Sequence, residues 1–315
     1  MLRLRHFAPL VVFCLVPVCA QAAPPGPQIL TEDVTRFYAM YDATAGKPTV
    51  EQIEQDYLAR GTPSLHEFAK LRRVTAQSIA DRMARDPAIY ANAKQCMTTL
   101  PAVEKRLTAA FARLAQVYPE AKFPPVAIVV GRGKPVGMAY PGGLTIGLEA
   151  LCAADFMNPD IEDRFVHVIA HEYGHIQQTG ATDFEDGDPR ATVLRVSLIE
   201  GGAEFISELI SGNVGNPGLA DRVRGHEREI ETRFARDIDS TDLTPWLYNY
   251  QAGTDAPYDQ GYWIGYRIAK SYYLQAKERG AAVRDILQLD DPKAFLAKSG
   301  WTPGMTLPPP GEGID

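Results

Sequence analysis

Apolar residues between positions 30 and 118 recur at spacings of three and four, the period of a helix with one buried face. The first such face is formed by Val34, Phe37, Tyr38 and Tyr41. Gly- and Pro-containing breaks interrupt the pattern at residues 46–48, 61–63 and 86–87. We therefore expect a helical N-terminal region over residues 30–120.

The period changes after this region. Residues 124–130 and 144–148 are short, apolar and rich in β-branched side chains, which predicts two strands around a glycine-rich turn at 131–143. Helical spacing returns at 158–179, 188–212 and 259–278, and Asn158 is the expected cap of the first of these helices. We expect an α+β, mainly helical domain over 121–305, whose 144–148 strand could pair with a peptide at a sheet edge. The proline-rich tail at 306–315 is expected to be disordered.

The N-terminus has the features of a secretory signal peptide. Arg3 and Arg5 precede a mostly apolar run at 7–20, and Ala20-Gln21-Ala22 fits a cleavage site. Residues 1–22 are therefore expected to be removed, and residues 23–29 to form a linker. This predicts an exported protein, periplasmic or secreted, with no stable membrane span after cleavage; an anchoring helix is the alternative.

Composition narrows the possible partners. The 315 residues are 45% hydrophobic and 23% charged, which is typical of a globular chain. Loss of Arg3 and Arg5 takes the formal charge from −7 to −9, which argues against a nucleic-acid partner. Cleavage leaves Cys96 and Cys152, which could form one disulfide or remain two buried thiols.

The candidate chemistry lies in the string His171-Glu172-Tyr173-Gly174-His175. Residues four apart share one helix face, so His171 and His175 can direct two imidazoles at one metal ion. Glu172 is displaced by about 100°, where it can hold a metal-bound water and take its proton. His167, one turn earlier, is expected to line the cleft or support a ligand, with a core histidine as the alternative.

A catalytic zinc ion needs a third protein ligand and leaves its fourth position to water. Gln178 and Ala181 exclude the metzincin pattern. Glu200, on the following helix, is the preferred third ligand, and Asp183 in an acidic loop is the alternative. Glu204, one turn after Glu200, could accept the other ring N–H of a ligand histidine.

These motifs carry a resemblance to known peptidases. The HExxH string followed by Glu200-Gly201-Gly202-Ala203-Glu204 resembles gluzincin zinc peptidases, among them the aminopeptidase N and thermolysin-like families. Residues 32–37, 123–125, 147–149, 261–267 and 299–301 are similar to an uncharacterised bacterial family of predicted zinc-dependent proteases. The resemblance implies a zincin-like core with one Zn²⁺, a small sheet before the HExxH helix and a helical C-terminal part.

The resemblance also implies a mechanism. Glu172 would be the general base toward a zinc-activated water, and a tyrosine or histidine further along the chain would stabilise the oxyanion. Tyr262 and Tyr266 are the candidate donors, with His226 a weaker one, and Arg267 could bind a substrate carboxylate or carbonyl. Core packing is the alternative for this aromatic segment.

The sequence therefore predicts an exported zinc-dependent metallopeptidase acting on a peptide or protein substrate. One alternative is a zinc-dependent hydrolase of a non-peptide amide or ester. The other is a non-catalytic, zinc-stabilised binding protein. Structural zinc sites usually fill all four positions with protein ligands, mostly cysteine, so the His, His and Glu set favours catalysis.

Overall fold

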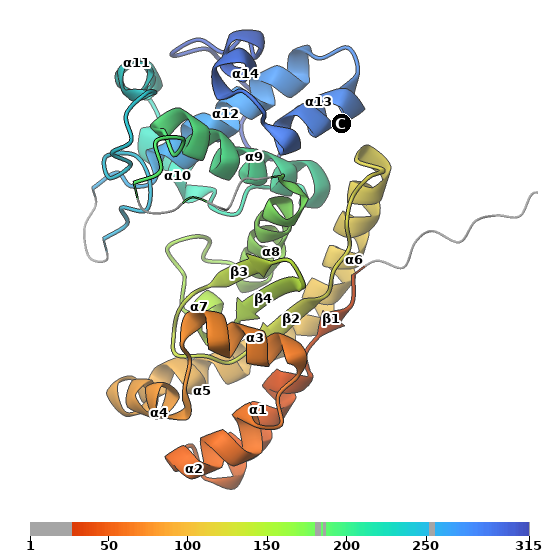
Figure 1. The fold of residues 1–315 in the computed structure, drawn as a ribbon, viewed down its shortest axis with the longest axis vertical. Helices are drawn as coiled ribbons and strands as arrows, with labels where there is room; N and C mark the ends of the chain where they lie inside the picture. The colour runs from red at the N-terminus through yellow and green to blue at the C-terminus, as the bar shows by residue number, and fades with distance from the viewer. Residues whose placement is uncertain (1–26, 180–183, 185–186, 252–255, 315) are drawn as a thin grey trace, which may run out of the picture.

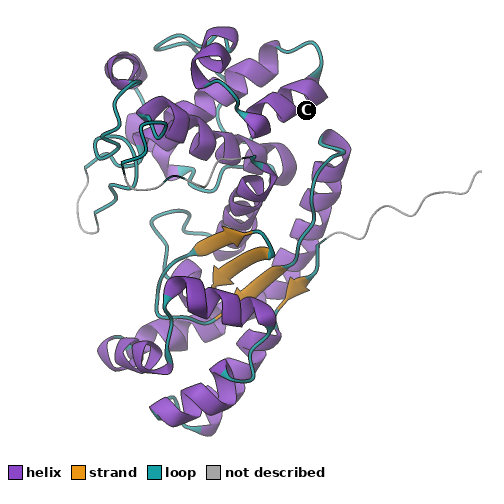
Figure 2. Cartoon of the chain, viewed as in Figure 1, coloured by secondary structure: helices purple, strands orange, loops and turns teal. Residues whose placement is uncertain are grey.

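The computed structural model describes residues 27–179, 184, 187–251 and 256–314. The expected signal peptide, most of the linker and Asp183 lie outside these residues. The fold is mainly helical with one small sheet, which confirms the α+β, mainly helical prediction (Figures 1 and 2). Helices α1–α5 lie at one end of the elongated molecule and α9–α14 at the other, with the sheet and α8 between them and α6 running alongside α8 (Figure 1).

The helices before the sheet are α1 (Glu32–Ala43), α2 (Val50–Gln52), the π-helix η1 (Ile53–Leu58), α3 (Pro63–Arg72), α4 (Ala76–Arg85), α5 (Pro87–Cys96), the 3-10 turn η2 (Met97–Thr99) and α6 (Leu100–Val117). Those after it are α7 (Leu148–Cys152), α8 (Ile161–Gln177), α9 (Val193–Ser211), α10 (Gly218–Val223), α11 (Glu227–Asp237), α12 (Gln260–Gln275), α13 (Arg279–Gln288) and α14 (Pro292–Lys298). The N-terminal breaks fall between helices, as predicted.

The sheet has the order β1-β2-β4-β3, formed by β1 (Ile29–Leu30), β2 (Val126–Val129), β3 (Gly137–Tyr140) and β4 (Gly143–Gly147). β1, β2 and β4 are parallel, and β3 is antiparallel to β4. Because β4 lies between β2 and β3, the expectation that residues 144–148 form a sheet edge is wrong. The edge strand on that side is β3, whose residues were predicted to belong to the glycine-rich turn at 131–143.

Tyrosine hydroxyls fasten the N-terminal helices to the sheet. The buried Tyr57 hydroxyl donates to the carbonyl of Val130 at 2.7 Å and accepts from its N–H at 2.8 Å. Tyr90 donates to the Gly131 carbonyl at 3.0 Å, and a Cys96–Cys152 disulfide joins α5 to the end of α7. Of the two possibilities left open for these cysteines, the structure has the disulfide and not two free thiols. The N-terminal helices hold the segment after β2 in place.

The three long helices of the C-terminal part touch at small residues. A Cβ atom added at Gly201 of α9 would lie 2.0 Å from the backbone nitrogen of Tyr266 in α12. One added at Gly265 would lie 1.7 Å from the Ser197 carbonyl oxygen. Gly174 of α8 meets Ala203 of α9 in the same way, at 3.2 Å. These contacts set α8, α9 and α12 side by side at backbone distance.

Two boundary expectations are corrected. Asp160, not Asn158, caps α8 by accepting the Asp163 N–H at 2.8 Å, while the Asn158 side chain accepts the N–H of Asp160. The C-terminal segment, residues 306–314, is ordered rather than disordered. The Pro309 carbonyl of this segment accepts a hydrogen bond from Lys270 at 2.9 Å, and the Gly311 N–H donates one to Glu208 at 2.6 Å.

In the described part of the chain, no helix has both the length and the apolar content that a membrane crossing requires.

Candidate metal centre

Helices α8 and α9 bring the three predicted ligands together. The Nε2 atoms of His171 and His175 lie 3.2 Å apart, and Oε2 of Glu200 lies 3.6 Å from the first and 3.2 Å from the second. Two ligand atoms that each lie about 2.1 Å from one tetrahedral zinc ion are about 3.4 Å apart. His171, His175 and Glu200, hereafter the metal triad, therefore have the spacing of one shared ion.

The electrostatics of the metal triad favour a bound cation. Burial opposes the charged form of His171, but the Glu204 and Glu200 carboxylates outweigh it and raise its pKa well above the usual range. Burial also opposes the charged form of His175, whose pKa is nevertheless raised by Glu200. For Glu200, burial is outweighed by the two histidines, and its pKa is lowered. A positive charge is thus stabilised where the three side chains meet.

Two further side chains orient the histidines. Nδ1 of His175 donates to Oε1 of Gln178 at 2.8 Å, and Nε2 of Gln178 donates to the Ile199 carbonyl of α9 at 2.7 Å. Oε1 of Glu204 lies 3.4 Å from Nδ1 of His171, but this nitrogen has no hydrogen-bond partner among the described residues, so the hydrogen bond expected from Glu204 is not formed. With their Nδ1 atoms facing these oxygens, both rings present Nε2 to the metal triad.

Two tyrosines complete the surroundings. The Tyr248 hydroxyl donates to Oε1 of Glu200 at 2.6 Å, and the Tyr262 ring is nearly parallel to that of His171, with ring centres 6.2 Å apart. Burial and the Glu200 charge raise the pKa of both phenols, so both remain protonated donors. Tyr262 was predicted. Tyr248 was not, because it lies in a loop without periodicity or motif.

The metal triad opens into a cleft of about 780 Å³, which Glu172, Tyr248 and Tyr262 also line. The Glu172 side chain lies against the backbone of β3, since a Cβ atom added at Gly137 would come within 2.7 Å of its Cδ. Met138 and Ala139 of β3 continue this wall. The general-base candidate and the edge strand therefore share one side of the cleft.

Arg72, at the end of α3, adds a cation to the cleft. Its exposed side chain lines the cavity, and its Nε donates to the sulfur of Met138 at 3.1 Å. Sequence reasoning missed Arg72 and Gln178 as site residues. The i, i+3 spacing from His175 is the one signal that could have indicated Gln178.

Other predicted site residues have partners elsewhere. Tyr266 is buried, and its hydroxyl donates to Oε2 of Glu208 at 2.9 Å. Arg267 is paired with the buried Glu231 at 2.5 Å. His167 is bonded to Ser211 through Nδ1 at 2.8 Å, the core alternative, and His226 is exposed beside Glu229. None of the four lines the cleft among the described residues, so the roles predicted for Tyr266 and Arg267 are not supported.

Comparison of the chain with family models, curated proteins and solved structures finds no match. The resemblance to gluzincins and to the uncharacterised bacterial family therefore stays a prediction. What the chain offers for interpretation is its own geometry, namely two imidazoles and a carboxylate that meet at the wall of an open cleft.

Proposed function

We propose that this chain is a zinc-dependent metallopeptidase with a zincin-like arrangement of α8, α9 and the small sheet. The observation that supports it is the metal triad, whose three donors meet at ligand spacing while Glu172 lines the same cleft without belonging to the triad. His171, His175 and Glu200 would hold the ion. A zinc ion bound there supplies a water of lowered pKa and polarises the carbonyl under attack.

The chain's own residues account for the proton transfers and the developing charge. Glu172 accepts a proton from the attacking water and returns it to the leaving amine. Tyr262, protonated and lining the cleft, is the donor toward the oxyanion, while Tyr248 donates its hydroxyl proton to Glu200 and holds that ligand. Of the two tyrosines predicted as donors, Tyr262 keeps that role in the proposal and Tyr266, which donates to Glu208, does not.

The edge strand favours a peptide over another amide or ester. β3 has a strand partner on one side within the described sheet, and Gly137, Met138 and Ala139 line the cleft. An extended chain could add to this edge through main-chain hydrogen bonds and pass the metal triad. A small ester has no peptide main chain that could form these hydrogen bonds with β3.

The non-catalytic alternative accounts for fewer of these features. A structural zinc ion would normally take four protein ligands, whereas the metal triad provides three and opens into a cleft. Export remains part of the proposal. It is supported by the Cys96–Cys152 disulfide, since such bonds persist mainly in oxidising compartments.

The test compares two glutamate variants with a matched control. We expect Glu172→Gln to keep one zinc ion per chain and to lose hydrolysis of a peptide library by about 10²–10⁴-fold. We expect Glu200→Ala to lose the ion itself. Glu229→Gln, whose side chain is 84% exposed, should match the wild type in both measurements.

Full zinc occupancy in Glu200→Ala would overturn the ligand assignment. Unchanged peptide turnover in Glu172→Gln would overturn the mechanism. A panel of non-peptide esters and amides, measured beside the library, separates the remaining alternative, because a preference for the small substrates would contradict the role of β3.

A further inference from the structure

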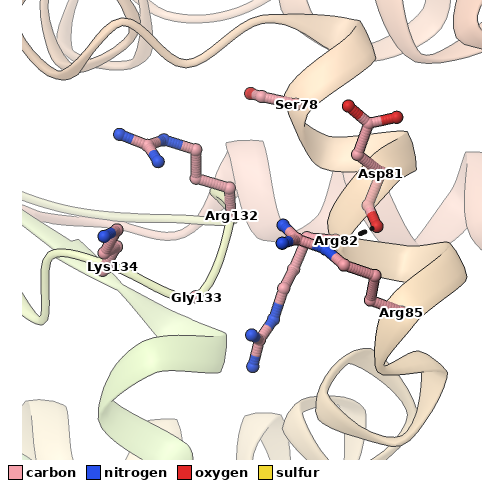
Figure 3. Close-up of a pocket in the computed structure, with 7 residues that line it drawn as sticks. All are labelled: Ser78, Asp81, Arg82, Arg85, Arg132, Gly133 and Lys134. Carbon is pink, nitrogen blue, oxygen red and sulfur yellow. Dashed lines mark hydrogen bonds between the residues drawn. The ribbon is translucent and has the colours of Figure 1, made fainter.

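Cations in the N-terminal part of the chain differ in what they face. Between α4 and the loop after β2, Arg82 and Arg132 point to opposite sides of a cavity of about 370 Å³, so they do not converge on one ligand (Figure 3). Arg72, in contrast, lines the cleft of the metal triad. It is the one arginine or lysine among the described residues that line this cleft, which makes it the candidate for recognising charge on a substrate.

The backbone at Arg72 is held in place at the end of α3. Arg73 follows in the left-handed conformation, at φ 51°, and its N–H donates to the carbonyls of Ala69 and Lys70, which ends the helix. The Arg72 carbonyl accepts a hydrogen bond from Nη2 of Arg132, in the loop after β2, at 3.2 Å. The Arg72 side chain therefore starts from a fixed point beside the sheet.

Strand β3 presents one face to α8 and the other to Arg72. A Cβ atom added at Gly137 would lie 2.7 Å from Cδ of Glu172, on α8. Successive side chains of a strand point to opposite faces, and the sulfur of the next residue, the buried Met138, accepts from Nε of Arg72 at 3.1 Å. Arg72 thus reaches the edge of the sheet from the face opposite Glu172, with its guanidinium group oriented by Met138.

The outer nitrogens of the Arg72 guanidinium group are available to a ligand. Among the described residues, its Nε is the one guanidinium nitrogen with a hydrogen bond, and no carboxylate pairs with the group. The acids of the cleft have other partners or roles, since Glu200 belongs to the metal triad, Glu172 is the proposed base, and Asp188 is paired with Arg190 at 2.5 Å. Two parallel donors on a planar group match the two oxygens of a carboxylate.

The α9 side of the cleft is lined differently. The buried Val196 and Ile199 of α9, together with Leu243, give it aliphatic side chains. A carboxylate placed against them would lose hydration without gaining a partner. A negatively charged group of a ligand is therefore favoured on the β3 side, beside Arg72.

We propose that Arg72 is a specificity-determining residue that binds a carboxylate of the substrate, an inference that rests on the proposed peptidase function. A peptide added to the β3 edge alternates its side chains between the face of Glu172 and the face of Arg72. Arg72 then selects an acidic side chain at one position, or at two positions separated by one residue, and not at the position between them. The same carboxylate chemistry could come from the C-terminus of the peptide.

The test uses labelled octapeptides on an alanine–leucine background. They are compared in pairs that differ by glutamate or glutamine at one position, or by a C-terminal carboxylate or amide. We expect the wild type to prefer the acidic member of a pair by about fivefold in kcat/KM, and Arg72→Gln to bring this ratio to about one. Arg72→Glu should instead prefer lysine over glutamine at the same position.

Arg85→Gln is the matched control. Arg85 is, like Arg72, the exposed last residue of a helix, in this case α4, and it does not line the cleft (Figure 3). The variant removes the same charge and should keep the wild-type ratio. Circular dichroism establishes that each variant is folded.

Peptide binding to the Glu172→Gln protein, followed by fluorescence anisotropy, separates this proposal from the hydrolase function. If the wild type hydrolyses no peptide, but adding Arg72→Gln to Glu172→Gln weakens binding of the acidic member alone, the hydrolase proposal fails and recognition by Arg72 stands. If peptides are hydrolysed and Arg72→Gln keeps the acidic preference, the role of Arg72 is wrong and the hydrolase proposal stands.

The two kinds of pair identify the source of the carboxylate. An Arg72-dependent preference for glutamate over glutamine supports recognition of a side chain. An Arg72-dependent preference for the free C-terminus over the amide supports cleavage near the end of a peptide. No acidic preference in the wild type, an equal loss in Arg85→Gln, or an equal effect of glutamate at every position would each overturn the proposal.

Discussion

Helix α9 carries two buried carboxylate clusters eight residues apart, and their difference separates a structural ion pair from a ligand site. Glu208 is fully satisfied by the protein: Lys270 donates to it at 2.8 Å, Tyr266 at 2.9 Å and the Gly311 N–H at 2.6 Å. Glu200 faces two histidines, whose ring nitrogens can lose their protons and bind a metal ion instead. Glu200 and Glu208 are both buried, so the groups that contact each carboxylate decide which of the two can hold a cation from solution.

The largest expected effect is in the Glu208 cluster. Lys270→Met leaves a buried carboxylate without its cation, and should lower the free energy of unfolding by about 3–5 kcal/mol in urea denaturation. Lys293→Met, at an exposed pair with Asp239, should have little effect. A double variant, Glu208→Leu with Lys270→Met, should recover part of the loss. A Lys270→Met protein as stable as the wild type would contradict the view that Glu208 and Lys270 form a structural ion pair.

Acid titration tests the same contrast on α8. His167 bonds to a serine hydroxyl, and burial lowers its pKa to about 4, with Asp163 raising it and Arg106 lowering it to smaller extents. Between pH 6.5 and 4 the unfolded chain binds a proton there that the folded chain does not, so stability falls as the pH falls. The free energy of unfolding falls by at most about 3 kcal/mol through this group.

The difference between the pH profiles of wild type and His167→Gln isolates this group. His167→Gln should show a shallower fall in stability, and His226→Gln, at an exposed position, should parallel the wild type. Parallel profiles for all three proteins would show that His167 is not buried in its neutral form.

Metal removal should act on the metal triad alone. At free zinc one hundred times the dissociation constant, binding stabilises the fold by about 2.7 kcal/mol, and a chelator should remove this gain in thermal unfolding. Glu200→Gln should no longer respond to the chelator, whereas Lys270→Met should retain the shift. A chelator-sensitive Glu200→Gln protein would place the ion elsewhere.

The smallest effect is expected at the hydrogen bond behind His175. Gln178→Met removes the acceptor of Nδ1 and the link to Ile199, and should weaken zinc binding about 10–100-fold in competition with a chromophoric chelator. Gln95→Met, at an exposed position on α5, is the control. Unchanged affinity would mean that the ring is oriented by packing alone.

Helix period and local spacing were enough to predict much of this molecule. The long helices, β2, β4 and the metal triad follow from patterns within a few residues, and Glu200 required only that successive helices pack together. β1 and β3 were missed because a two-residue strand and a strand among glycines have no readable period. Tyr248 and Gln178 act through contacts with Glu200 and Ile199 that the folded chain alone creates.

The proline-rich end shows the limit of composition. Residues 306–314 looked disordered because no apolar period is present, yet they are held by backbone groups that meet Lys270 and Glu208. Tyr266 and Arg267 were assigned to the cleft from their side-chain types. Their carboxylate partners, Glu208 and Glu231, lie 58 and 36 residues away in the sequence and occupy them within the core.

The contact between Gly201 and Gly265 limits how the cleft can open. Helices that touch through backbone atoms have no side chains between them whose rotamers could change, so α9 and α12 cannot slide past each other as helices with larger residues between them do. Glu200 and Tyr262 are therefore parts of one rigid frame. Any widening of the cleft to admit a ligand falls to the segments around that frame, of which the exposed loop bearing Tyr248 is nearest to Glu200.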